Sequence, residues 1–279
     1  MTTTTIKQAL ATVQTAGLDR LDAQLLLLHA LAKPESERAW LLAHDADELP
    51  ETVADVFHSC SLRRATGEPL AYIVGYKEFF GLRLSVDARV LVPRPDTETL
   101  VQWALDILQN AAAPAVLDLG TGSGAVAIAL AHSLACKNTC KVTATDFSED
   151  ALAVASQNAR QLGSDVQFIH SHWFEKVSGH YHVIASNPPY IACADPHLAS
   201  LAHEPLSALA AGSDGLSDIR QIVQQAPRHL HPGGWLLLEH GYDQASAVCE
   251  LLSQRGFRQV QSRMDLADIA RCSGGQWAP

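Results

Sequence analysis

The sequence lacks any hydrophobic run long enough to cross a membrane. Its most apolar stretch, residues 25–32, contains a histidine and is much shorter than the roughly 18 residues that a spanning helix needs. The first ten residues, MTTTTIKQAL, have neither the basic region nor the apolar core of a signal peptide. We therefore expect no membrane segment and a cytoplasmic location.

Cysteines and basic residues are also few. The six cysteines are scattered without the spacing of a disulfide framework or a zinc site, so we expect free thiols and no metal. Lysine and arginine number 20 against 30 aspartates and glutamates, which gives a net charge of −10. This balance argues against a partner bound chiefly through its phosphates, and no direct nucleic-acid substrate is expected.

What is present divides the chain into three regions. The 279 residues are 47% apolar, enough for one large domain or two smaller ones. Residues 1–72 have a helical pattern throughout and predict a small helical domain, with Asp19 as a candidate N-cap. In residues 73–93 the period changes: EFFGLRLSV alternates around Gly81 and predicts a β-hairpin linker.

The third region, residues 94–279, alternates short apolar strands with amphipathic helices from residue 115 onward. This order is typical of an α/β fold of Rossmann-like type, with a mostly parallel sheet and helices on both faces. The tail, residues 257–275, contains two closely spaced strand patterns, which predict an antiparallel edge. The last of them is expected to be the edge strand.

A glycine-rich turn, LDLGTGSGA at residues 117–125, ends the first of these strands and opens a helix. Gly120, Gly122 and Gly124 let the backbone turn sharply and let a ligand approach without meeting a Cβ. Asp146 ends the next strand, where an acidic residue typically binds ribose hydroxyls. The dinucleotide spacing is missing, so a nucleoside without phosphates fits better than NAD; the alternative is an ordinary pair of turns with a capping aspartate.

A second unusual turn, SNPPYI at residues 186–191, ends a later strand of the same sheet. Its prolines remove two N–H donors and restrict the backbone, which leaves the Asn187 side-chain oxygen and the Pro188 carbonyl as fixed acceptors. Two rigid acceptors suit a planar NH₂ group, and Tyr190 offers a ring beside it or near a cationic methyl donor. The alternative is a proline turn that merely ends the strand.

These motifs resemble known proteins. DLGTGSG, TATD and SNPPY resemble the S-adenosylmethionine-dependent methyltransferases that modify amino groups. EPLAYIVGYKEFFGL, VLVPRPDTETLV, EPLSALAAGSDGL and PGGWLLLEHGYDQ are similar to one branch, the release factor glutamine methyltransferases (PrmC/HemK family). The resemblance runs from about residue 65 to the tail. It implies a seven-stranded methyltransferase domain that methylates the side-chain amide nitrogen (N5) of the GGQ glutamine in class-1 peptide chain release factors, modulating translation termination.

The resemblance also implies roles for individual residues. The loop Gly120, Thr121, Gly122, Ser123 and Gly124 would line the methionine part of S-adenosylmethionine, whose product is S-adenosylhomocysteine. Asp146 would hold the ribose and Trp173 would lie beside the adenine. Asn187 would contact both donor and substrate. The catalytic corner would grip the glutamine amide through Asn187, Pro188, Pro189 and Tyr190.

The chemistry of an amide explains why a corner of acceptors is useful. Its nitrogen is a poor nucleophile because the lone pair is delocalised into the carbonyl. Acceptors at Asn187 and Pro188 would hold both N–H hydrogens, so we expect no general-base triad. The alternative substrate is an adenine N6 or guanine N2 amino group in DNA or rRNA. A non-catalytic adaptor is a further alternative, and such a protein should be indifferent to Asn187.

Three further features concern the site, the tail and the partner. Glu239 ends another strand at the crevice and is either a group that helps to close the site or a solvated carboxylate. The tail motif Gly274-Gly275-Gln276 copies the proposed substrate, and we interpret it as chance. The helical domain is expected to recognise the release factor, and the protein is expected to be a monomer.

Overall fold

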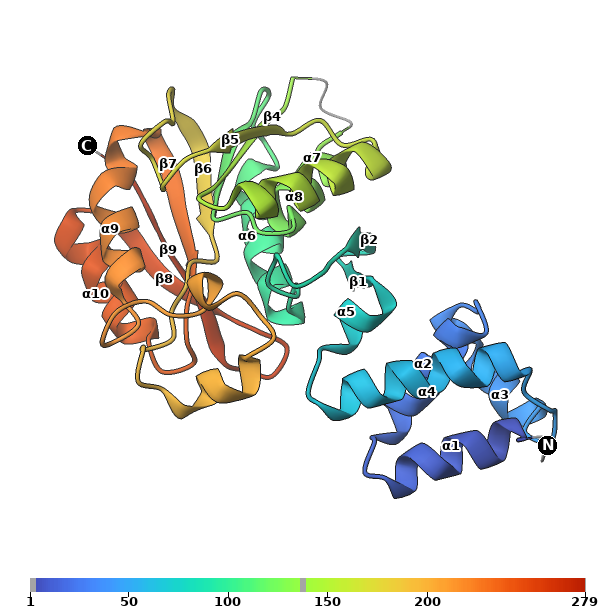
Figure 1. The fold of residues 1–279 in the computed structure, drawn as a ribbon. Helices are drawn as coiled ribbons and strands as arrows, with labels where there is room; N and C mark the ends of the chain where they lie inside the picture. The colour runs from blue at the N-terminus through green and yellow to red at the C-terminus, as the bar shows by residue number, and fades with distance from the viewer. Residues whose placement is uncertain (1–3, 136–138, 279) are drawn as a thin grey trace. The chain divides into compact units, whose positions relative to one another are not determined.

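A computed structural model describes residues 4–135 and 139–278 of the chain. The chain forms two compact units, Met1–Tyr76 and Lys77–Pro279 (Figure 1). The hairpin that the sequence places in a separate linker therefore groups, except for its first residue, with the second unit. Within the described residues, no helix is long and apolar enough to span a membrane. Cys136 lies outside them; the described cysteines are free.

The first unit is helical. It consists of α1 (Ile6–Thr15), α2 (Arg20–Ala30), the 3-10 turn η1 (Glu35–Glu37), α3 (Arg38–Ala43), α4 (Glu51–Ala65) and α5 (Leu70–Val74). The leucine run of α2 is buried against Ile6, Leu41 and Phe57, which explains a stretch too apolar for an exposed helix. Asp19 caps α2 as predicted, since its side chain accepts hydrogen bonds from two backbone N–H groups of the first turn.

The second unit opens with the predicted hairpin and continues into one sheet. The hairpin strands are β1 (Tyr76–Phe79) and β2 (Leu82–Ser85). The strands of the large sheet are β3 (Ala115–Leu119), β4 (Lys141–Asp146), β5 (Gln167–His170), β6 (Tyr181–Ser186), β7 (Leu230–Glu239), β8 (Arg258–Met264) and β9 (Ala270–Gln276). Their order is β5-β4-β3-β6-β7-β9-β8, and the pairs from β5 to β7 are parallel. The Rossmann-like seven-stranded fold with antiparallel pairing towards one edge is confirmed.

The final strand, however, is not the edge strand that the sequence predicts. Strand β9 lies between β7 and β8 and is antiparallel to both, so β8 forms the edge. Two glycines make this position possible: a Cβ on Gly274 would lie 2.6 Å from Leu237, and one on Gly275 would lie 2.8 Å from Phe257. The copy of the GGQ motif is therefore part of a sheet, as expected of a chance match.

Helices cover both faces of this sheet (Figure 1). Residues of α6 (Glu98–Leu108), α7 (Ala125–Ser133) and α8 (Glu149–Leu162) belong to one apolar core, and residues of α9 (Ser217–Gln225) and α10 (Ala245–Arg255) belong to the other. Short 3-10 turns connect them: η2 (Pro95–Thr97), η3 (Pro196–Leu201), η4 (Leu206–Ala208) and η5 (Ala226–Arg228). Both faces of the central strands are thus buried, which leaves the strand ends to carry polar groups.

One buried amide fixes the glycine-rich turn to its surroundings. Asn158 of α8 is fully buried, and its Oδ1 accepts a hydrogen bond from the Ser85 backbone N–H at 2.8 Å. Its Nδ2 donates to the carbonyls of Ser85 at 3.0 Å and Ser123 at 2.9 Å. The side chain therefore joins α8, β2 and the glycine-rich turn by three hydrogen bonds.

Replacing this amide should destabilise the second unit. Asn158→Ala leaves buried backbone groups unpaired, and we expect a loss of about 2–4 kcal/mol in the free energy of unfolding. Urea denaturation followed by tryptophan fluorescence measures it. Gln161→Ala is the control on the same helix, because it removes one exposed hydrogen bond to Ser85. Equal losses of unfolding free energy in the two variants would contradict the proposed role of Asn158 in joining α8, β2 and the glycine-rich turn.

Candidate active site

Four neighbouring strands end in a row at one edge of the sheet. The register runs from Thr145 through Leu119 and Ser186 to Leu238. The residues that follow these four in the sequence therefore lie in a second row: Asp146, Gly120, Asn187 and Glu239. Because parallel strands end on the same side, this row forms the polar edge where α/β proteins bind their ligands.

The glycine-rich turn is held by the sheet and by a buried carboxyl. The backbone N–H groups of Gly120 and Thr121 both donate to the Thr145 carbonyl at 2.9 Å. Asp118 accepts hydrogen bonds from the Thr121 hydroxyl at 2.6 Å and from the Ala127 N–H at 3.2 Å. Burial raises the pKa of Asp118 to about 7, against the lowering effect of these hydrogen bonds.

The three glycines of the turn have different surroundings. All three have positive φ angles: 71° for Gly120, 54° for Gly122 and 85° for Gly124. A Cβ on Gly124 would lie 2.7 Å from Ile128, so this glycine allows close helix packing. Nothing lies within 4 Å of a Cβ on Gly122, which faces open space. The turn thus presents bare backbone to a ligand at its middle.

Asp146 lies beside this open backbone. Its Oδ2 accepts a hydrogen bond from the Gly122 N–H at 2.8 Å, and its Oδ1 accepts one from the Ser148 N–H at 2.9 Å. Burial raises its pKa, although both hydrogen bonds favour the ionised form. The Phe147 backbone also interacts with this carboxylate, and since a carboxylate has about four acceptor positions, one remains for an incoming hydroxyl.

Aromatic rings follow the ends of β4 and β5. A Cβ on Gly120 would lie 3.4 Å from the Trp173 ring, so the indole packs directly against the turn. Trp173 has a φ of 47°, and the ring of His172 lies between it and the 69% exposed Phe147. These rings offer apolar faces for a flat base. The sequence prediction included Trp173 but missed Phe147, although an aromatic residue directly after Asp146 was visible.

The corner Asn187–Tyr190 is fixed from several sides. The Asn187 Nδ2 donates to the Thr97 hydroxyl at 3.3 Å, which leaves the side-chain oxygen as the acceptor. Gln244 donates to the Tyr190 carbonyl at 3.0 Å. A Cβ on Gly215 would lie 2.2 Å from that carbonyl oxygen, so only glycine fits there. The corner is therefore rigid, as the two prolines predict.

Glu239 lies behind this corner and is not solvated. Its residue is 1% exposed, and burial raises its pKa to about 7. The Thr97 hydroxyl and the Asn187 amide interact with it and lower the pKa, as does Arg271, whereas Asp96 raises it. The solvated interpretation of this carboxylate is wrong. Its position as the last residue of an apolar strand, like that of Asp146, was the available signal.

A further pair braces the segments on either side of the corner. Arg94 forms an ion pair with Glu204, whose Oε2 also accepts a hydrogen bond from the Val92 N–H at 3.0 Å. This links the chain before Thr97 to the segment after Tyr190. Neither residue was predicted, because the contact spans 110 positions in the sequence. In the described part of the chain, no group of three or more potential ligands could hold a metal ion.

Comparison with known proteins agrees with this architecture. Residues 4–75 match the PrmC N-terminal domain, and residues 97–212 match the methyltransferase small domain. The first match covers the helical unit, in which the resemblance of the sequence motifs begins only at about residue 65. A methyltransferase from Pyrococcus furiosus shares the fold, with a TM-score of 0.51, 21% identity and coverage of 72% of this chain and 91% of that one.

Curated relatives cover nearly the whole chain. The release factor glutamine methyltransferase of Bordetella pertussis is 49% identical over 263 residues, which are 93% of this chain and 95% of the relative. That of Pseudomonas aeruginosa is also 49% identical, over 93% of each chain. The chain belongs to the release factor glutamine methyltransferase family.

Proposed function

We propose that this protein transfers a methyl group from S-adenosylmethionine to the side-chain amide nitrogen of the GGQ glutamine in class-1 peptide chain release factors. The observation that carries the proposal is the alignment of Gly120, Asp146 and Asn187 in one row at the sheet edge. A donor held by the first two positions would present its methyl group beside the third. The free thiols fit a reducing cytoplasm, where this substrate would be found.

The residues at the edge fit this donor. Gly122 leaves open backbone where the methionine part would lie, and Asp146 keeps an acceptor position for a ribose hydroxyl. Trp173, packed on Gly120, would contact the adenine. The sulfonium of the bound donor supplies the methyl group, and Thr121, Ser123 and Gly124 complete the turn around it.

The corner would act on the glutamine amide. The Asn187 oxygen and the Pro188 carbonyl accept its two N–H hydrogens, while Pro189 and Tyr190 pack beside it. Hydrogen bonds to both hydrogens orient the nitrogen and favour its pyramidal form, an interaction that strengthens toward the transition state. Thr97 fixes the orientation of the Asn187 amide, so that its oxygen faces the substrate.

Glu239 would set the direction of this hydrogen-bond chain. As a carboxylate it accepts from the Thr97 hydroxyl, which is then free to accept from the Asn187 Nδ2. A protonated carboxyl would instead donate to Thr97 and turn the threonine hydrogen toward Asn187, competing for the oxygen that the substrate needs. Glu239 is thus a positioning residue in our proposal.

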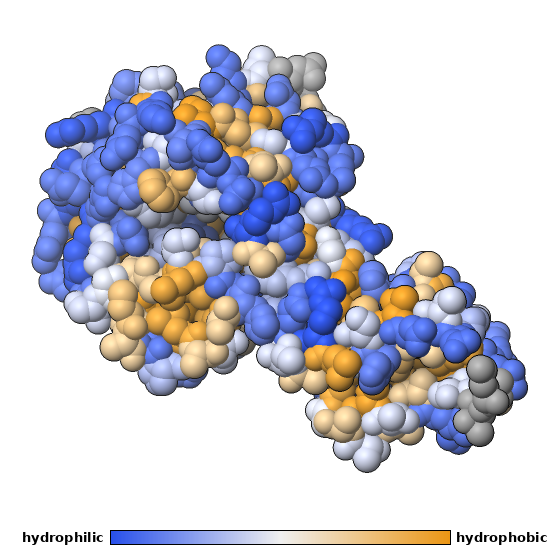
Figure 2. All heavy atoms as spheres, in the orientation of Figure 1, coloured by the Kyte–Doolittle hydropathy of each residue, from blue (hydrophilic) through white to orange (hydrophobic). Residues whose placement is uncertain are grey.

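The surface after the corner supports a protein substrate. The segment 192–211 is joined to the corner by the Ile191 N–H, which donates to the Leu209 carbonyl at 2.9 Å. Figure 2 shows apolar side chains gathered over this part of the second unit, and Leu206 is 63% exposed. An exposed apolar patch is typical of a protein contact, whereas a nucleic-acid contact requires basic groups.

The substrate assignment can be tested by methyl transfer from labelled S-adenosylmethionine. We expect label in an intact class-1 release factor, and background label in its GGQ glutamine-to-alanine variant, in total RNA and in DNA. The reason is that the corner offers acceptors for an amide and few cations for phosphates. Label in RNA or DNA alone would assign the corner to a base amino group and refute the proposal.

The role of Glu239 predicts a pH dependence. Ionisation of a carboxyl with a pKa of about 7 should make kcat/KM rise as the pH increases through 7. Glu239→Gln should remove this rise and lower kcat/KM at pH 8 about tenfold, since an amide can donate to Thr97 as well as accept and no longer fixes the direction of the hydrogen-bond chain. Steady-state kinetics from pH 5.5 to 8.5 measure both, with the exposed Glu250→Gln as control. An unchanged profile in Glu239→Gln would contradict the role.

A further inference from the structure

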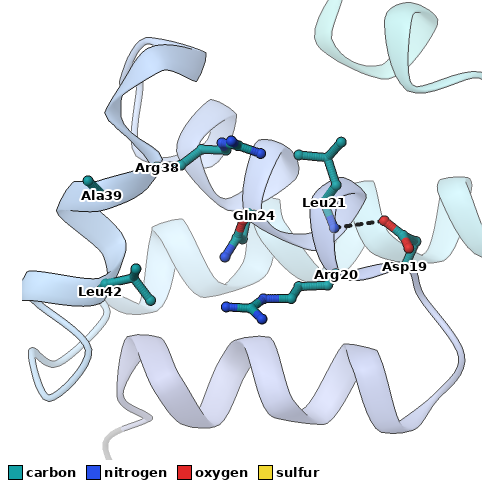
Figure 3. Close-up of a pocket in the computed structure, with 7 residues that line it drawn as sticks. All are labelled: Asp19, Arg20, Leu21, Gln24, Arg38, Ala39 and Leu42. Carbon is teal, nitrogen blue, oxygen red and sulfur yellow. Dashed lines mark hydrogen bonds between the residues drawn. The ribbon is translucent and has the colours of Figure 1, made fainter.

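A hollow of about 540 Å³ lies in the helical unit and shares no residue with the site described above. It is formed by the first turns of α2 together with α3, as Figure 3 shows. Seven residues line it: Asp19, Arg20, Leu21, Gln24, Arg38, Ala39 and Leu42. Three properties of this lining point to a ligand.

The first property is unpaired positive charge. Arg20 and Arg38 are exposed, and no carboxylate pairs with either guanidinium in the described residues. Arg64, on another helix of the same unit, is paired with Asp22 at 2.6 Å. The one acidic residue of the hollow, Asp19, caps α2 through a 2.7 Å hydrogen bond from the Leu21 N–H. Two free cations therefore share a hollow in a chain of net charge −10.

The second property is an amide that faces the hollow. Gln24 is 9% exposed as a whole residue, and its side chain lines the hollow. Figure 3 shows its amide in the hollow, between the two guanidinium groups. Gln24 adds N–H donors to those of the arginines, and this donor set suits a carboxylate.

The third property is the apolar rim. Leu21 is 44% exposed and Leu42 is 64% exposed, and both line the hollow beside the arginines. A free phosphate would leave these side chains in contact with water. A peptide that carries an acidic residue next to apolar ones would cover them while its carboxylate met the donors.

We propose that this hollow binds an acidic residue with apolar neighbours on the protein substrate. The occupant rests on the proposed function, because a methyl acceptor that is a protein has a body outside its glutamine loop. Charge complementarity identifies the segment: guanidinium groups and an amide face its carboxylate, and the leucine rim faces its apolar side chains. The hollow thus contributes to the affinity for the intact substrate and takes no part in methyl transfer.

Kinetics with two substrates test the proposal. Arg20→Glu/Arg38→Glu should raise KM for the intact release factor about tenfold with little change in kcat, because a desolvated charge contact is lost. Transfer to a short peptide with the GGQ loop should be unchanged. Lys7→Glu/Arg258→Glu is the control, with the same change of net charge at two exposed sites. Equal KM values for the factor in the two double variants would overturn the proposal, while transfer itself would still support the function.

A direct binding assay tests the hollow independently of methyl transfer. A labelled peptide of alternating glutamate and leucine should bind the full-length protein in fluorescence anisotropy, and the arginine double variant should bind it about tenfold more weakly. Gln24→Leu should also weaken binding, because the N–H donors that its amide adds to the hollow are removed. Equal binding by all variants, or stronger binding of an RNA oligonucleotide than of the peptide, would refute an acidic peptide as the occupant.

Discussion

The register of the parallel strands is the constraint on which the site depends. Once β4, β3, β6 and β7 pair as they do, the paired residues near their carboxyl ends form one row, and the residues that follow them in the sequence have to form another. Four segments that are far apart in the sequence then bring an acidic residue, a bare glycine turn, an amide and a buried carboxyl to one edge. The helices on both faces keep that edge as the place where polar groups can meet water or a ligand.

Burial of carboxyls at this edge has a cost that shapes the site. Asp118 and Glu239 both have a pKa of about 7 because they are removed from water. An unfolded chain releases these protons near pH 4, so these groups reduce the stability of the fold as the pH rises from about 4 to about 7. Hydrogen bonds from Thr121 and Thr97 offset part of this cost and, in doing so, fix the glycine turn and the Asn187 amide. The buried carboxyls thus lower the stability of the fold and also make the site rigid.

The sequence predicted the features that depend on local pattern. Strand and helix periodicity gave the α/β class, and the glycine turn, Asp146 and the proline corner were recognisable because each follows an apolar strand. Non-local features were missed: the Arg94–Glu204 pair joins distant segments, and burial of Glu239 depends on neighbours that no local pattern reveals. The place of β9 was mistaken because the tight packing of Gly274 and Gly275 is visible only in the sheet.

The central claim is that the corner Asn187–Tyr190 binds the glutamine amide that accepts the methyl group. The most direct test measures Asn187→Ala twice, by calorimetry with S-adenosylhomocysteine and by single-turnover transfer to a release factor. Our account predicts product binding weakened at most about tenfold and a transfer rate reduced about 10²–10³-fold, because the lost interaction is made chiefly in the transition state. An unchanged transfer rate would contradict the account, and so would a loss confined to product binding.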